Sequence, residues 1–126
     1  MRLTLSKEEK LKSRKLIEKL FIEGDSLKEY PLRLKYLKIR DENNSVKVAF
    51  SVPKRNFKLA VDRNRIKRLL RESYRKNKVV FVEGLIGEYI LMFMYTDSIE
   101  WSQVDLDKKI LRLMNKFVKS EKQRTI

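Results

Sequence analysis

The chain contains neither cysteine nor histidine. Disulfide bonds are therefore impossible, and zinc sites of the usual Cys/His kind are excluded. The same absences exclude Ser-His-Asp and Cys-His arrangements for nucleophilic catalysis. The longest apolar run, Tyr89–Tyr95, is too short to span a bilayer, and the cation-rich N-terminus lacks the apolar core of a signal peptide. These absences predict a cytoplasmic protein without a catalytic site of its own.

What the chain has in excess is positive charge. Its 126 residues suit one domain, and a hydrophobic share of 42% suffices for a buried core. The formal net charge is +14, yet no lysine or arginine occurs between Val79 and Asp107, where six acids lie. A balance this basic indicates a polyanionic partner such as nucleic acid, and the segregation of signs indicates a directed surface. We expect the acids of 79–107 to form a solvated surface that RNA avoids.

The hydrophobic pattern predicts an α+β fold. Helical periodicity appears in 6–24, 61–76 and 101–120, with Ser6 or Ser13, Asp62 and Ser102 as expected N-caps. Alternation predicts strands over 30–39 and 46–52, and an apolar run predicts a central strand at 88–96. In the first strand, Leu32, Leu34 and Tyr36 alternate with Arg33 and Lys35. Residues 79–82 are expected either to extend the second helix or to form a short extra strand. Residues 120–126 are expected to fray. The whole chain, 1–126, is expected to form a single RNA-binding domain.

The segment RNRIKRLLR, residues 63–71, contains five cations in nine residues. Like charges one turn apart repel each other in an isolated helix, so this density favours a phosphate-bearing partner. On a helical projection Ile66, Leu70 and Tyr74 share the packing side, and most of the cations lie opposite. Three cations of the preceding loop extend the basic set. The predicted RNA-binding residues are Lys54, Arg55, Lys58, Arg63, Asn64, Arg65, Lys67, Arg68, Arg71 and Arg75.

Aromatic residues allow two interpretations. Phe21, Tyr30 and Tyr36 are candidates for stacking on unpaired bases, although core packing is the commoner use of such side chains. Trp101 is expected to pack at the start of the last helix. Composition and spacing alone do not decide between RNA and DNA.

The stretch FSVPKRNFKLAVDRNRIKRLLRESYR, Phe50 to Arg75, resembles the signature of the protein subunit of bacterial ribonuclease P. The family's pattern has a strand ending in Ser-Val, two cations, Ala-Val, Arg-Asn-Arg, Lys-Arg and Arg-Glu. The matching residues are Ser51, Val52, Lys54, Arg55, Ala60, Val61, Arg63, Asn64, Arg65, Lys67, Arg68, Arg71 and Glu72. The chain departs from the pattern at Pro53 and Phe57, where the family usually has serine and a glycine-containing loop.

The resemblance implies a function as well as a fold. In this family the RNA subunit hydrolyses the phosphodiester with Mg²⁺ that the RNA mainly holds, and the protein binds that RNA and the 5′ leader of precursor tRNA. It implies the order α-β-β-β-α-β-α around one four-stranded sheet, with a left-handed β-α-β crossover. It also implies a leader cleft between first helix and sheet, which we assign to Phe21, Arg33, Lys35 and Tyr36. The family's strand aromatic aligns with Lys35, so charge is expected to contribute more than stacking.

Three other interpretations compete. A structural ribosomal RNA-binding protein fits the size and charge but not the long signature. A stand-alone nuclease would need a catalytic constellation that the sequence lacks. A helix-turn-helix DNA-binding protein would need a second helix shortly before residue 62, where strand and loop are predicted.

Overall fold

The computed structural model describes residues 9–79 and 85–124, except for the side chain of Arg124. These residues form three helices and four strands in the predicted order. The elements are α1 (Arg14–Glu23), β1 (Asp25–Glu29), β2 (Leu32–Arg40), β3 (Ser45–Ser51), α2 (Ala60–Asn77), β4 (Glu88–Tyr95) and α4 (Gln103–Arg124). The predicted α+β class is confirmed, and β1 supplies the third strand before the basic helix. No helix within the described ranges combines the length and apolar character needed to cross a bilayer.

The sheet has the strand order β1-β2-β4-β3. β2 runs antiparallel to both of its neighbours, whereas β3 and β4 are parallel. Parallel neighbours require a crossover connection, and α2 lies in the connection between them. This arrangement is the β-α-β unit that the family resemblance implies. Its left-handed sense stays a prediction.

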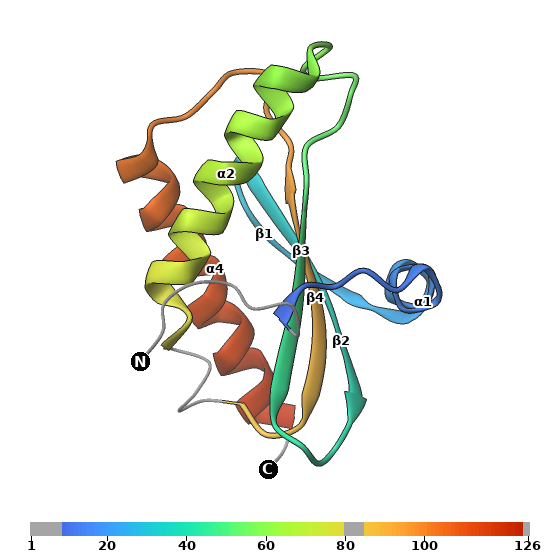
Figure 1. Cartoon of the computed structure of the whole chain (residues 1–126). Helices are drawn as coiled ribbons and strands as arrows, with labels where there is room; N and C mark the ends of the chain where they lie inside the picture. The colour runs from blue at the N-terminus through green and yellow to red at the C-terminus, as the bar shows by residue number, and fades with distance from the viewer. Residues whose placement is uncertain (1–8, 80–84, 125–126) are drawn as a thin grey trace.

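Two helices cover one face of the sheet, and α1 lies on the other (Figure 1). Because side chains alternate along a strand, Leu32, Leu34 and Tyr36 of β2 all enter the core beneath α2 and α4. In that core the ring of Tyr74 on α2 lies 5.9 Å from the ring of Phe93 on β4. Burial of these aromatic side chains supplies much of the apolar surface that holds α2 in place.

The smaller core lies between α1 and the opposite face of the sheet. Leu20 of α1 is fully buried against Ile90 and Met92 of β4. At Gly24 the chain leaves α1 and passes so close to β2 that a Cβ atom there would lie 2.9 Å from the carbonyl oxygen of Tyr36. The glycine therefore permits the close approach that places the end of α1 beside β2.

A polar junction ties α2 to α4. The fully buried hydroxyl of Ser73 donates to the carboxylate of Asp107, and Gln103 Nε2 donates to the Ser73 hydroxyl at 2.6 Å. Burial opposes ionisation of Asp107, but hydrogen bonds from Ser73 and Gln103 outweigh it and hold its pKa below the usual value. Because its polar groups are paired, the junction fixes how α2 lies against α4.

The element boundaries differ from the sequence predictions in three places. The first helix begins at Arg14, capped by Ser13 as one alternative predicted, while Ser6 lies outside the described residues. Asp62 is not the N-cap of α2, because the helix begins at Ala60 and its N-cap is Leu59.

At the C-terminal end, the predicted fraying from residue 120 is wrong for 120–124, since α4 continues to Arg124 and buries Glu121. The cap at Ser102 is confirmed by its hydrogen bond from the backbone of Asp105. The alternatives for 79–82 lie largely outside the described residues.

Candidate nucleic-acid interface

One face of α2 presents a row of side chains that no other part of the described chain engages. Asn64, Lys67, Arg68 and Arg71 follow each other at i, i+3, i+4 and i+7, which places them on one stripe of the helix. We call these four residues the α2 ridge. Three are exposed and Lys67 is partly exposed, and among the described residues none of the four has a hydrogen-bond or ion-pair partner. The ridge therefore presents three cations and one amide to solvent.

Arg65 lies beside the ridge but is neutralised by acids. Its Nε and Nη2 atoms donate to the two carboxylate oxygens of Glu100 at 2.7 and 3.1 Å, and Nη2 also donates to Asp62 at 2.9 Å. The hydrogen bond to Glu100 is the main reason that the pKa of Arg65 is raised. A guanidinium with two carboxylate partners offers less positive potential to phosphate than its free neighbours do.

Arg63 and Arg75 also have partners within the protein. Arg63 Nη1 donates to the carbonyl oxygens of Phe57 and Lys58, both at 2.8 Å. It thereby fastens the loop that enters α2 instead of pointing only outward. Arg75 forms a two-pronged ion pair with Glu72, one turn away, which raises its pKa. The ten predicted residues are thus not equally available for RNA.

The loop between β3 and α2 adds three exposed cations, Lys54, Arg55 and Lys58. The loop is closed by hydrogen bonds from the backbone of Asn56 and Phe57 to the carbonyl oxygen of Pro53. The ring of Phe57 packs 5.9 Å from that of Tyr95. The two residues that depart from the family pattern, Pro53 and Phe57, therefore shape and anchor this loop.

A second basic surface lies on the side of the sheet that α1 covers only in part. Arg33 and Lys35 of β2 point to this side, and the register pairs them with Lys28 and Ser26 of β1. Lys35 Nζ donates to the carbonyl oxygen of Phe21 at 3.3 Å and lies 5.9 Å from its ring centre. We call Phe21, Lys28, Arg33 and Lys35 the open face. It combines three cations with an aromatic ring that is 46% exposed.

The family model for ribonuclease P matches residues 5–118 of the chain. The chain belongs to the ribonuclease P protein family. The match covers the α2 ridge, the loop before it and the open face. The resemblance that the signature in 50–75 carries is therefore confirmed.

Two relatives carry the name ribonuclease P protein component. The protein of Chlorobium phaeobacteroides is 43% identical over 79 residues, which is 60% of this chain and 54% of that protein. The protein of Porphyromonas gingivalis is 45% identical over 76 residues, covering 59% of this chain and 55% of the relative. The chain spans about half the length of the curated relatives it matches.

The fold also agrees with a solved structure of this family. The ribonuclease P protein of Thermotoga maritima superposes with a TM-score of 0.71 at 22% identity, covering 86% of this chain and 96% of that one. At this identity the likeness shows the fold alone. The three helices and four-stranded mixed sheet described above are thus the architecture of a ribonuclease P protein.

The assignment of Tyr36 to the leader cleft is wrong. Tyr36 is only 3% exposed, its ring lies 4.7 Å from that of Phe117 on α4, and it faces away from Arg33 and Lys35. The alternation along β2 requires this, because neighbouring residues of a strand point to opposite faces. Phe21, Arg33 and Lys35 do lie on one side of the sheet, as predicted.

The sequence analysis did not identify Lys28 on the open face. The strand that carries it, β1, has only five residues and was not predicted. The period-two alternation of Ser26 and Lys28 with Leu27 and Glu29 was the available signal, and it is short.

Two of the described acids in 79–107 do more than form the solvated surface that was expected. Glu100 and Asp107 pair with Arg65 and Lys76 of α2. Glu83 lies outside the described residues. Within the described ranges, no three acidic residues gather in a way that would hold a metal ion.

Proposed function

We propose that this chain is the protein component of ribonuclease P. In this proposal it binds the RNA subunit and the 5′ leader of precursor tRNA, and it assists the endonucleolytic removal of that leader. The observation that carries the proposal is the α2 ridge, a row of unpaired cations inside the family's signature. Arginine side chains without protein partners are suited to bidentate contacts with phosphate.

The α2 ridge and the loop cations are proposed to face the RNA subunit. They lie next to each other in the chain, because the loop of Lys54, Arg55 and Lys58 leads directly into α2. Each contact to phosphate releases a counterion, so assembly should weaken steeply as salt is added. The two-pronged pairs of Arg65 and Arg75 with acids make these residues secondary contributors in the proposal.

The open face is proposed to hold the unpaired leader. Its cations lie across β1 and β2, and Phe21 offers a partly exposed ring beside Lys35. A single strand is bound by this combination, because cations follow its backbone and aromatic rings stack on its bases. With Tyr36 in the core, charge carries more of this contact than stacking does.

The chemical step is proposed to take place on the RNA subunit with Mg²⁺ that the RNA mainly holds. The chain's own contribution is to bind, orient and screen phosphate charge, which lowers the Mg²⁺ concentration that the RNA needs. The chain lacks histidine and cysteine, so it offers no general base or nucleophile of those kinds. The expected compartment of the assembly is the cytoplasm.

Cleavage of a 5′-extended precursor tRNA at low Mg²⁺ tests the proposal. The reaction is run with the chain alone, with bacterial ribonuclease P RNA alone, and with both. Cleavage at the mature 5′ end only in the combined reaction is the expected result. Absence of stimulation with several bacterial RNA subunits would favour a structural role in ribosomal RNA binding. Cleavage by the chain alone would mean that the active site lies in the protein.

A further inference from the structure

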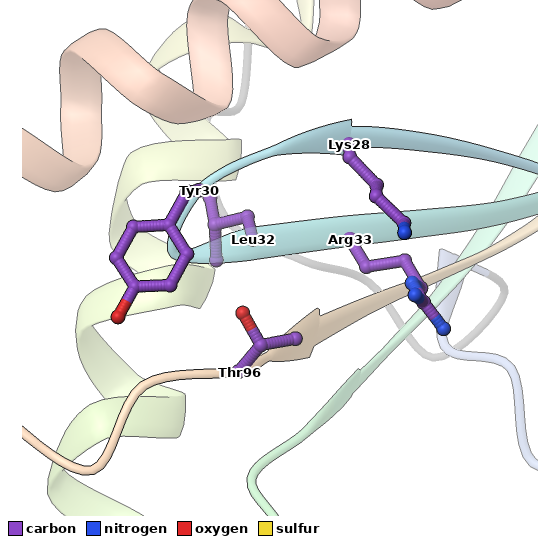
Figure 2. A pocket seen from close by; sticks show the side chains of 5 residues that line it. All are labelled: Lys28, Tyr30, Leu32, Arg33 and Thr96. Carbon is purple, nitrogen blue, oxygen red and sulfur yellow. The ribbon is translucent and has the colours of Figure 1, made fainter.

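A small cavity of about 210 Å³ lies at the end of the sheet where β1 turns into β2. It is lined by Lys28, Tyr30, Leu32, Arg33 and Thr96, and we call it the Tyr30 pocket. Figure 2 shows the Tyr30 ring at one end of the pocket and the side chains of Lys28 and Arg33 at the other. Thr96 follows β4 and closes the third side, because its backbone and hydroxyl both donate to the carbonyl oxygen of Pro31.

Tyr30 is exposed yet held in a fixed position. Its side chain is 59% exposed, and the interaction of its hydroxyl with the carboxylate of Asp97 raises the pKa of the phenol. Asp97 is fixed in turn by the indole N–H of Trp101 at 2.8 Å. The Tyr30 and Trp101 rings meet edge to face, 6.0 Å apart. An exposed ring that is pre-positioned in this way is suited to stack on a planar partner.

The opposite end of the pocket is cationic. Lys28 and Arg33 are directly opposite each other in the β1–β2 register, on the same face of the sheet. The Nε atom of Arg33 is enclosed and has no hydrogen-bond partner among the described residues. A donor that finds no acceptor within the protein is unfavourable, so the Arg33 guanidinium would gain from a ligand oxygen toward which it can turn. A negatively charged oxygen also suits the two cations.

The pocket therefore has two chemically distinct ends. The carboxylate of Asp97 interacts with the Tyr30 hydroxyl and disfavours a second negative charge there, whereas Lys28 and Arg33 attract one. A ligand with a flat, uncharged ring at one end and a phosphate at the other matches this polarity. Both parts occur in every nucleotide of an RNA strand.

We propose that the Tyr30 pocket binds one unpaired nucleotide, with its base against Tyr30 and its phosphate at Lys28 and Arg33. The inference rests on the proposed function, since the unpaired leader is the strand that would supply this nucleotide. Register partners continue from Arg33 to Met94 and Ser51 across the sheet, toward the loop that carries Lys54. A strand lying along this row would connect the pocket with the cations that precede α2.

The chain carries its own reporter for this site, because Trp101 is its only tryptophan and touches Tyr30. We would titrate the full chain with fluorescein-labelled hexauridylate and hexaadenylate, following anisotropy, and with unlabelled RNA, following Trp101 emission. Tyr30→Leu should weaken binding roughly tenfold, because stacking on one aromatic ring contributes that order of affinity. Tyr30→Phe keeps the ring and should bind within about twofold of the original chain.

Two lysine variants test the phosphate end. Lys28→Ala should weaken binding more than Lys119→Ala, which removes the same charge from an exposed position on α4. Trp101 emission should change on saturation of the original chain and much less in the Tyr30→Leu variant. Circular dichroism of each variant establishes that it is folded before its affinity is compared.

The proposal is overturned if folded Tyr30→Leu binds both oligonucleotides as tightly as the original chain does. It is equally overturned if Trp101 emission stays unchanged at saturation. These outcomes are separate from failure of the proposed function. A chain that stimulates precursor tRNA cleavage and gives either result has the function without the pocket, whereas a chain that neither binds oligonucleotides nor stimulates cleavage lacks both.

Discussion

Arg65 on α2 and Glu100, just before α4, form a two-pronged ion pair with N–O distances of 2.7 and 3.1 Å. The pair connects residues 35 positions apart in the chain. Arg65 is therefore engaged within the protein, whereas other cations of α2 are not. Arg68 and Arg71 are exposed and have no partner in the described part of the chain, so they and not Arg65 should dominate phosphate binding.

Substitution of Arg68 and Arg65 should therefore have unequal effects on RNA binding. Arg68→Ala should lower affinity for the RNA subunit and reduce the slope of log K against log salt by about one. Arg65→Ala should change that slope by clearly less, because the acids already screen its charge. Filter binding at several salt concentrations measures both values. Equal slopes for the two variants would show that Glu100 releases Arg65 on assembly.

Removal of the acidic partner of Arg65 should strengthen RNA binding, which is the opposite of removing a cation. Glu100→Gln removes one carboxylate partner and should raise RNA affinity and the salt slope, because Arg65 becomes available to phosphate. Glu42→Gln is the matched control, since it makes the same charge change at an exposed acid outside the interface. An increase of the same size in both variants would be an effect of net charge alone.

Arg63 should contribute more to stability than the residues of the α2 ridge do. Arg63→Ala removes two hydrogen bonds to loop carbonyls and should lower the free energy of unfolding by about 1–2 kcal/mol. Lys67→Ala removes no such bond and should unfold like the original chain. Urea denaturation followed by circular dichroism compares the two. A stable Arg63→Ala protein would mean that the loop is held by other contacts.

Phe21 and Tyr36, both assigned to the leader cleft from the sequence, should have different roles. Tyr36→Ala should destabilise the fold by about 3–5 kcal/mol, because it empties a buried position beside Phe117. Phe21→Ala removes a half-exposed ring and should cost much less stability while weakening the binding of single-stranded RNA. Thermal unfolding together with oligonucleotide affinity separates the two effects. A wild-type melting curve for Tyr36→Ala would contradict its place in the core.

Glu29 on β1 should make stability depend on acid pH. The hydrogen bond from Lys116 is the main cause of its lowered pKa, and Lys109 adds to it. A carboxylate with a depressed pKa stabilises the fold above its unfolded pKa, about 4.3, and loses that contribution as pH falls through the folded value. The unfolding temperature of Glu29→Gln should therefore be lower than that of the original chain at pH 7, and the difference should shrink toward pH 3.

The control for this titration is Glu23→Gln, which changes an exposed acid at the end of α1. Its unfolding temperature should follow that of the original chain across the same pH range. A pH-independent deficit in Glu29→Gln would show that the residue acts through packing and not through its charge.

The sequence by itself determined the features that depend on local pattern. Helical spacing alone placed Asn64, Lys67, Arg68 and Arg71 on one stripe opposite Ile66 and Leu70, because a helix repeats every 3.6 residues whatever surrounds it. The Arg-Asn-Arg frame in 50–75 indicated the family for the same reason, since its residues are close in the chain. Even the alternation of β2 set Tyr36 apart from Arg33 and Lys35, so the assignment of Tyr36 to the leader cleft went against the pattern of the strand itself.

Tertiary structure decided which of these side chains are available. The partner of Arg65 comes from a distant segment, and the Tyr30 pocket joins the β1–β2 turn to the end of β4. Such contacts depend on the strand order β1-β2-β4-β3 and on how α2 lies against α4. No local pattern encodes them, because they form between residues far apart in the chain once the core has fixed the helices and strands in place.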